Sequence, residues 1–336
     1  MVISDETTPD LTGFDAVQMF GLVRPQEAWL QARNAKRQGK GVVLATVYCE
    51  FWEFERRARR GLPGWIARHT SRNVIEALKA GGRGVVSREW SRGSAALFTR
   101  GYERMQRDII GMTDLFLPNS QSEWQRVVAD FGAAADDSAV QVVPNGVDTD
   151  YFRPDAIDGE PPEHLAAFEG CVLCVARIEG RKNQLQLVEA LDGTGLQLVL
   201  AGKPAPNQPG YVAEVRRRAG DGVHVLGPVS EDEKRWLYKL ARVHALPSWM
   251  ETTGLSSLEA AAMGCSLAVS PAGDTRDYFG EDATYCDPAD AESIRTAVPD
   301  AYGRPPSDAL ASRIRDEYNW NRTADVTYAA YRRRFG

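Results

Sequence analysis

Residues 247–264 read PSWMETTGLSSLEAAAMG, and they connect one short apolar segment to the next. Glu251 and Glu259 stand eight positions apart, and Gly254 lies between them, where a loop gives way to a helix. The helix is rich in Ala and Leu, which is typical of a helix that is covered on most sides. The stretch therefore predicts a strand end, a loop and a crossover helix, the repeating unit of a parallel sheet.

The same unit recurs along the second half of the chain. Helical segments alternate there with predicted strands at 171–178, 196–202, 223–227, 243–248 and 266–270. Such an alternation predicts a doubly wound sheet, and ligands of doubly wound sheets bind at the carboxyl ends of the strands. The polar and glycine-containing stretches of this half follow those strand ends.

The first half alternates less regularly. Its predicted strands cover 14–22, 41–48, 113–120 and 140–148. The segment 122–132 is predicted as a helix with Ser122 as its N-cap, and a polar linker near 150–165 separates the two halves. We therefore expect an α/β protein with two Rossmann-like domains in tandem, which suits a chain of 336 residues.

The overall charge argues against nucleic acid as the main partner, because 46 Asp and Glu outnumber 40 Lys and Arg and the net charge is −6. One stretch departs from this balance: the Arg56–Arg107 basic region holds 13 Lys or Arg and only 3 acidic residues. It is either a solvated helical face or a surface for an anionic membrane or acceptor. The second interpretation predicts peripheral membrane contact.

The five cysteines do not have the spacing of a disulfide framework. Cys171 and Cys174 lie three apart in a predicted strand, so their side chains point to opposite faces and do not share a metal. The sequence has no apolar run of about 18 residues, the length that a membrane helix needs, and its polar N-terminus lacks a signal-peptide core. We expect reduced thiols in a cytoplasmic protein.

Two cations follow the first strand of the second half. Arg177 and Lys182 stand five apart on a strand-to-helix turn, where a guanidinium and an ammonium suit a diphosphate. The alternative is a pair of ordinary loop cations.

The opening stretch offers a second set of groups. Gly254 lacks a Cβ, so backbone can approach a ligand closely, and the N–H groups of Leu255, Ser256 and Ser257 at the helix start suit a phosphate. Carboxylates accept hydrogen bonds from vicinal hydroxyls, so one of Glu251 and Glu259 suits a sugar and the other a ribose. The alternatives are a solvated loop acid at Glu251 and a favourable helix-end charge at Glu259.

Asp148 and Asp150 form a D-x-D pattern, which in other settings chelates a divalent metal. Here the pattern follows a Pro-Asn-Gly turn, and we interpret it as part of that turn. Arg177 and Lys182 already supply positive charge for a diphosphate, so no metal is expected.

At these residues the sequence resembles the retaining glycosyltransferases of family 4, which have the two-domain GT-B fold. The resemblance covers residues 113–290 well and the first hundred residues poorly. Thr253 stands where the family commonly has Phe. The segments that carry the resemblance are PNGVDTDYFRP (144–154), VARIEGRKNQ (175–184), ETTGLSSLE (251–259) and GDTRDYFGEDATYCDP (273–288).

The resemblance implies roles for matching positions. Arg177 and Lys182 hold the donor diphosphate, and Glu251 contacts the hydroxyls of the donor sugar; these three are the candidate catalytic residues. The candidate donor-binding residues are Gly254, Leu255 and Ser256 at the phosphate, Glu259 at the ribose, and Gly273, Asp274 and Thr275 along the donor pocket.

The resemblance also implies the reaction and the domain layout. The protein would transfer a sugar from a nucleotide-diphospho-sugar, with retention and without a metal or other cofactor, to a glycan, lipid-linked or small-molecule acceptor. The expected domains are 1–153, an acceptor-side Rossmann-like domain; 154–317, a nucleotide-sugar-binding Rossmann-like domain; and 318–336, a helix that crosses back onto the first.

Two departures concern the first domain. Its first strand-like segment, 14–22, resembles a later strand of the family, so a reduced or truncated domain is expected. The family often has a His at the end of the strand that 41–48 resembles, and this chain has none there; Tyr48 or Glu50 would have to take its place.

These departures keep an alternative open, a non-catalytic GT-B protein that binds a nucleotide-sugar or serves as a subunit of a glycosyltransferase complex. An NAD-linked oxidoreductase is disfavoured, because no G-x-G-x-x-G follows a strand and the glycines of residues 81–84 are predicted to form a turn after a helix.

Overall fold

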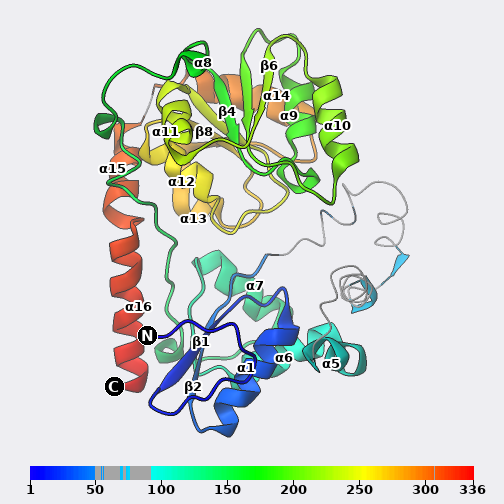
Figure 1. The fold of residues 1–336 in the computed structure, drawn as a ribbon, viewed down its shortest axis with the longest axis vertical. Helices are drawn as coiled ribbons and strands as arrows, with labels where there is room; N and C mark the ends of the chain where they lie inside the picture. The colour runs from blue at the N-terminus through cyan, green and yellow to red at the C-terminus, as the bar shows by residue number, and fades with distance from the viewer. Residues whose placement is uncertain (50–53, 55, 57–68, 71–72, 76–91, 306) are drawn as a thin grey trace. The chain divides into compact units, whose positions relative to one another are not determined.

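The computed structural model describes residues 1–49, 54, 56, 69–70, 73–75, 92–305 and 307–336. The chain forms two compact units (Figure 1). Unit 1 comprises Met1–Pro144 together with Ala324–Gly336, and unit 2 comprises Asn145–Thr323. Each unit has its own sheet and its own core.

Within its described residues, unit 1 has a parallel sheet in the order β1-β2-β3. The strands are β1 (Ala16–Phe20), β2 (Gly41–Ala45) and β3 (Leu115–Phe116). The helices α1 (Pro25–Arg37), α5 (Arg92–Arg100), α6 (Tyr102–Met112) and α7 (Gln121–Phe131) belong to the same unit. Apolar side chains of the helices, such as Trp29, Ile109 and Val127, are buried with Val42 and Leu44 of β2 against one face of the sheet.

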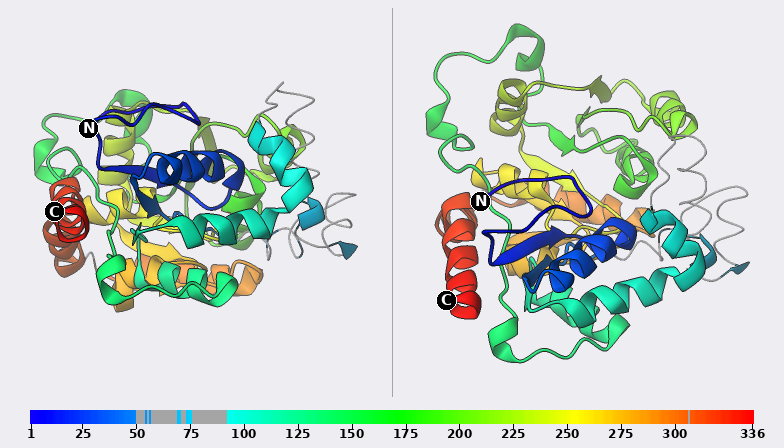
Figure 2. Two further views of the ribbon diagram at one scale, coloured as in Figure 1. Left: turned by 90° about the horizontal axis from the view of Figure 1, so that it is seen from below. Right: turned by 60° about the horizontal axis from the view of Figure 1, so that its bottom comes forward.

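The final helix, α16 (Trp320–Phe335), covers the other face of this sheet. Ala330 is buried there against Val43 and Leu115, which alternate along their strands with the residues of the first face. The approach is close at Gly41, because a Cβ at that position would lie 2.4 Å from the ring of Phe335. Figure 2 shows α16 on one side of β1 and α1 on the opposite side.

Two sequence predictions for this region were wrong. No strand covers 140–148; Val140 forms only an isolated bridge with Phe116, and Pro144, which has no N–H, interrupts the segment. The cap of α7 is Ser120 and not Ser122, since the Ser120 hydroxyl accepts from the backbone N–H of Glu123 at 2.8 Å.

Unit 2 holds a six-stranded, wholly parallel sheet in the order β6-β5-β4-β7-β8-β9. Its strands are β4 (Val172–Val175), β5 (Leu198–Ala201), β6 (Val223–Gly227), β7 (Val243–Leu246), β8 (Ser266–Val269) and β9 (Ala283–Tyr285). Its helices are α8 (Glu163–Ala166), α9 (Gln184–Leu191), α10 (Pro209–Arg218), α11 (Glu231–Leu240), α12 (Leu255–Ala262), α13 (Thr275–Phe279), α14 (Ala291–Gly303) and α15 (Asp308–Glu317).

The five strands expected in this half are all present, and β9 is an addition. The predicted helix over 308–336 is two helices, α15 and α16, because the chain leaves helical geometry at Tyr318. Chain order within the sheet reverses at one place: the chain moves outward from β4 through β5 to β6 and then returns to add β7 on the other side of β4. That reversal between β4 and β7 is the switch point where such sheets bind ligands.

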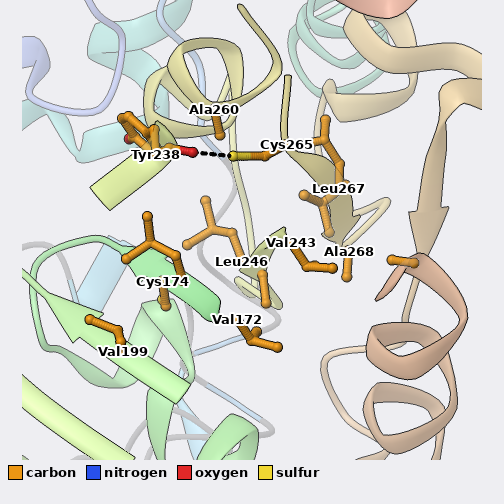
Figure 3. Close-up of a cluster of buried hydrophobic side chains, with 14 of the residues drawn as sticks. Val172, Cys174, Val199, Tyr238, Val243, Leu246, Ala260, Cys265, Leu267 and Ala268 are labelled. Atoms are coloured by element: carbon orange, nitrogen blue, oxygen red, sulfur yellow. Dashed lines mark hydrogen bonds between the residues drawn. The ribbon is translucent and has the colours of Figure 1, made fainter. Parts of the chain in front are cut away.

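The buried apolar side chains of unit 2 form one large cluster around this sheet, and Figure 3 shows part of it. Val172 and Val243 are paired neighbours on β4 and β7, and both are fully buried. The Cys265 thiol donates to the carbonyl of Tyr238 at 3.2 Å, as the dashed line in Figure 3 shows. Burial raises the pKa of Cys174 to about 12, and all five cysteines are free, as predicted.

Candidate functional site

An ion pair marks the switch point. Lys182 follows β4 and Glu251 follows β7, and the Lys182 ammonium donates to Oε1 of Glu251. The Glu251 side chain is 11% exposed and that of Lys182 is 24% exposed. A pair this far from bulk water interacts more strongly than a surface pair, and the exposed part of Lys182 leaves donors for a ligand.

The turn that carries Lys182 is built from polar contacts. Residues Gly180–Lys182 form one turn of 3-10 helix, and Asn183 then adopts a left-handed conformation with φ of 62° before α9 begins. The Asn183 amide donates to the carbonyl of Pro288 at 2.8 Å. The short side chain of Asn tolerates the left-handed region better than most residues do, so Asn183 allows the chain to turn directly from Lys182 into the helix.

Glu251 is held by its backbone as well as by its side chain. Its N–H donates to the carbonyl of Ala272 at 3.0 Å, and its own carbonyl accepts from the N–H of Asp274 at 2.9 Å. Gly273, between those two residues, has φ of +106°, and a Cβ there would lie 1.9 Å from the Glu251 carbonyl oxygen. The predicted site residue Gly273 is thus needed for the approach of the loop after β8 to the loop after β7.

The start of α12 is open to a ligand. Gly254 is its N-cap with φ of +72°, and Leu255 is 47% exposed. No group in the described part of the chain accepts from the N–H of Leu255 or Ser256, and such groups lie at the positive end of the helix. The expectation for Ser257 was wrong, because its N–H donates to the carbonyl of Gly254 at 2.7 Å.

A buried histidine lies beneath this helix start. Nε2 of His244, on β7, lies 3.1 Å from the hydroxyl of Ser257. Burial lowers the pKa of His244 to about 3, and the charge of Lys182 acts in the same direction. His244 is therefore a neutral core residue.

Arg177 stands apart from the Lys182–Glu251 pair. Its side chain is exposed just beyond the carboxyl end of β4, and it forms no ion pair with any residue that the structure describes. Its carbonyl accepts from the amide of Gln184 at 2.8 Å, which fixes the backbone from which the guanidinium extends.

Glu259 is engaged by α11. Its two carboxylate oxygens accept from the ammonium of Lys234 at 3.1 Å and from the hydroxyl of Tyr238 at 2.8 Å. Burial raises the pKa of the Glu259 carboxyl, and Lys234 opposes that rise. The side chain is 17% exposed, so a ligand hydroxyl would share these oxygens with the two protein donors. Sequence analysis missed Lys234 and Tyr238, because they lie 25 and 21 residues before Glu259 on another helix and no short sequence motif links them to it.

Asp274 and Thr275 are wholly buried at the start of α13. The Thr275 hydroxyl donates to the carbonyl of Ser270 at 2.6 Å. Thr275 thereby holds the loop between β8 and α13, which also carries Gly273.

The D-x-D pattern is a turn, as predicted. Oδ1 of Asp148 accepts from the backbone N–H groups of Asp150 at 3.2 Å and Tyr151 at 3.0 Å. In the described ranges, no three His, Cys, Asp or Glu side chains gather as metal ligands would. None of the helices described is both long and apolar enough to cross a lipid bilayer.

In unit 1, a buried carboxylate shapes the carboxyl end of β2. Glu123 accepts from the Thr46 hydroxyl at 2.5 Å and from the Tyr48 N–H at 2.6 Å. Val47, between them, has φ of +36°, which is strained for a β-branched residue. The Tyr48 hydroxyl donates to Asp130 at 2.7 Å, and the Tyr48 ring is buried. The Tyr48 side chain is therefore not presented to a ligand at the end of β2. Glu50 lies outside the described residues.

Much of the Arg56–Arg107 basic region also lies outside the described residues, including Arg57, Arg59 and Arg60. Within the described part, Arg100 forms an ion pair with Asp108 at 3.0 Å and stacks on the ring of Trp29.

Known proteins resemble both the sequence and the fold. Residues 169–303 match the family described as Glycosyl transferases group 1. D-inositol 3-phosphate glycosyltransferase from Mycobacterium avium is 29% identical over 245 residues, which cover 68% of this chain and 57% of that protein. The protein of the same name from Mycobacterium tuberculosis is 28% identical over 249 residues, 69% of this chain and 51% of that protein. The chain thus spans about half the length of these relatives.

Solved structures share the architecture at low sequence identity. Sucrose-phosphate synthase from Thermosynechococcus elongatus aligns with a TM-score of 0.66 at 17% identity, covering 95% of this chain and 73% of that one. HepE from Anabaena, solved in complex with UDP-glucose, aligns with a TM-score of 0.65 at 14% identity, covering 95% and 78%. The chain therefore has the GT-B fold, and its residues 169–303 match the family described as Glycosyl transferases group 1.

Proposed function

We propose that this protein transfers a sugar from a nucleotide-diphospho-sugar to an acceptor, with retention at the anomeric carbon and without a metal. The observation that supports the proposal most is the Lys182–Glu251 pair at the switch point, next to the open N–H groups of Leu255 and Ser256. Positive charge and free donors at a strand edge suit a diphosphate, and a held carboxylate suits sugar hydroxyls.

Each group then has a role in the proposed reaction. Lys182 and Arg177 stabilise the charge that develops on the diphosphate as the glycosidic bond breaks. Glu251 accepts hydrogen bonds from the donor sugar and orients it. The start of α12 binds a phosphate through the N–H groups of Leu255 and Ser256. Cations of the protein supply the charge that a metal would supply elsewhere, which is the reason for proposing a metal-independent reaction.

The comparisons suggest ligands to try first. HepE was solved with UDP-glucose and with UDP, so we propose a uridine-diphospho-sugar as donor. The curated relatives are named for D-inositol 3-phosphate, so we propose that a phosphorylated polyol is the first acceptor to test, ahead of glycans and lipid-linked acceptors. Glu259 is proposed for the ribose, which it would hold together with Lys234.

The proposal extends to the setting in which the protein works. Free cysteines suit a reducing compartment, so we propose a cytoplasmic enzyme. Peripheral membrane contact through the Arg56–Arg107 basic region is part of the proposal and would show as sedimentation with anionic liposomes that weakens as salt rises.

One observation favours a non-catalytic nucleotide-sugar-binding protein as the second candidate. In unit 1, the carboxyl end of β2 carries no His, and Tyr48 is turned inward, so the described residues there present no obvious acceptor-side group. A binder and a transferase would share the donor site of unit 2 and differ only in turnover.

The test measures binding and turnover separately. Isothermal titration with UDP, GDP and ADP should show binding of at least one, and Glu251→Ala should abolish transfer while circular dichroism remains that of the unmutated protein. Mass spectrometry of UDP-sugar incubated with D-inositol 3-phosphate, or without acceptor, would detect transfer or hydrolysis. Binding without either reaction would favour the second candidate, and no nucleotide binding would refute both.

A further inference from the structure

Thr253, two residues after Glu251 and next to Gly254, is tied to the first residue of unit 2. The side-chain amide of Asn145 donates to the Thr253 hydroxyl at 2.8 Å. The Thr253 hydroxyl in turn donates to the hydroxyl oxygen of Tyr278, on α13, at 3.2 Å. The backbone N–H of Asn145 donates to the same Tyr278 oxygen at 3.1 Å. Three segments of unit 2 thus meet at one buried hydroxyl.

The bonds of this network lie away from water. Thr253 and Tyr278 are each almost completely buried. A hydrogen bond in such surroundings is costly to leave unmade, because the buried polar group has no solvent to turn to. A side chain without a hydroxyl at position 253 would remove one hydrogen-bond partner from Asn145 and one from Tyr278.

The network completes the fixing of the loop after β7. Glu251 is held at one end by its backbone bonds to Ala272 and Asp274. Thr253 is held at the other end by Asn145 and Tyr278, immediately before the left-handed Gly254. With both ends fixed, the direction of the Glu251 carboxylate and of the first N–H groups of α12 is fixed as well.

We propose that Thr253 is a positioning residue for donor binding, acting through Asn145 and Tyr278 on the backbone that carries Glu251 and Gly254. The proposal rests on the proposed function for its consequence, weaker donor binding. It does not rest on it for its first step, the ordering of the loop. The competing explanation is a purely structural role, in which the hydroxyl adds stability and leaves the loop geometry unchanged.

Hydrogen exchange of the unliganded protein tests the ordering step. Thr253→Val keeps the shape of the side chain and removes the hydroxyl, whereas Thr253→Ser keeps the hydroxyl. We expect faster exchange for peptides over residues 249–258 in Thr253→Val and in Tyr278→Phe, and unchanged exchange in Thr253→Ser. Unchanged exchange in both Thr253→Val and Tyr278→Phe would overturn the proposal, whether or not the protein binds nucleotides.

Nucleotide titration tests the consequence, with Thr194→Val as the matched control. The Thr194 hydroxyl donates to the carbonyl of Leu191 at 2.7 Å and accepts from the N–H of Leu196, so the control loses two hydrogen bonds on the loop before β5. For whichever of UDP, GDP and ADP binds, Thr253→Val should raise the Kd about three- to tenfold, the worth of one or two hydrogen bonds. Thr194→Val and Thr253→Ser should stay within about twofold.

The outcomes separate the two proposals. Equal changes of Kd in Thr253→Val and Thr194→Val would indicate general destabilisation and overturn the positioning role. Faster exchange over residues 249–258 in a protein that binds none of the nucleotides would support the ordering of the loop by Thr253 and refute the proposed function alone.

Discussion

At the level of single residues, the carboxylate of Glu251 depends on Lys182, because no other cation is paired with it among the residues described. Lys182→Ala would leave this nearly buried charge uncompensated. We expect the free energy of unfolding to fall by about 1–3 kcal/mol, less than for a fully buried pair, and nucleotide binding to weaken at least about tenfold. Urea unfolding and calorimetric titration would measure the two effects.

A surface pair gives the control for this prediction. Lys36 pairs with Asp114 in unit 1, and the two side chains are 37% and 28% exposed. Lys36→Ala should cost less than about 1 kcal/mol, as exposed pairs generally do, and should leave nucleotide binding unchanged. Equal losses in the two variants would show that Lys182 is an ordinary surface cation.

His244 predicts how stability depends on pH. Its folded pKa, about 3, lies below the ordinary value of 6.5, so the folded state disfavours the protonated ring. Its contribution is fully present above pH 6.5 and is lost as the pH falls from there toward 3, by roughly 1 kcal/mol per pH unit. Urea unfolding at pH 7.5, 6.5 and 5.5 should show this slope, and His244→Gln should flatten it.

Glu259 provides a check of sign. Its pKa is raised by burial, so its contribution is present below the ordinary carboxyl pKa of 4.5 and is lost as the pH rises through the raised folded value. Glu259→Gln should therefore leave the slope between pH 6.5 and 5.5 no flatter than in the unmutated protein. If the slope became flatter in Glu259→Gln but not in His244→Gln, the assignment of this pH dependence to His244 would be wrong.

At the level of elements, the start of α12 and the loop before β5 give a matched pair of glycines. Gly254 and Gly193 have nearly the same φ, +72° and +70°, and a Cβ meets nothing closer than 3.3 Å at the first and nothing within 4 Å at the second. Alanine at either position should cost about 1 kcal/mol for the left-handed backbone. Only Gly254→Ala should also weaken nucleotide binding, which titration would measure. Equal binding by the Gly254→Ala and Gly193→Ala variants would show that the start of α12 is not part of the nucleotide site.

The secondary structure could be predicted where apolar segments are continuous. The strands around β4, β7 and β8 are runs of buried residues that the sequence displays directly. β9 is three residues long and escaped prediction, because so short a run has no detectable period. The segment 140–148 looked like a strand because of its valines, but pairing is a tertiary property and only isolated bridges form there.

The sequence predicted the site residues at the strand ends but not the partners that hold them. The positions of Lys182 and Glu251 follow from strand ends and spacing, and the structure joins them in one ion pair. The partners Lys234 and Asn145 come from parts of the chain 25 and 108 residues away from Glu259 and Thr253. No local pattern encodes contacts over such distances in sequence.

At the level of the whole molecule, each unit has a core of its own, and this predicts two thermal transitions. A bound nucleoside diphosphate should raise the transition temperature of unit 2. At a ligand concentration of a hundred times the Kd, the stabilisation is about 2.7 kcal/mol. Deleting residues 324–336 would uncover Val43 and Leu115 and should lower the transition of unit 1 alone. Differential scanning calorimetry would show both shifts; a ligand shift confined to the transition that the deletion lowers would place the donor site in unit 1.

The division of the chain into units also bears on the order of folding during synthesis. Unit 2 is one continuous segment, whereas unit 1 includes residues 324–336, which the ribosome adds after all of unit 2. A nascent domain completes its fold once its residues have emerged. The later half of the protein can therefore become native first, while the earlier sheet waits with Val43 and Leu115 exposed on one face for helix α16 to arrive.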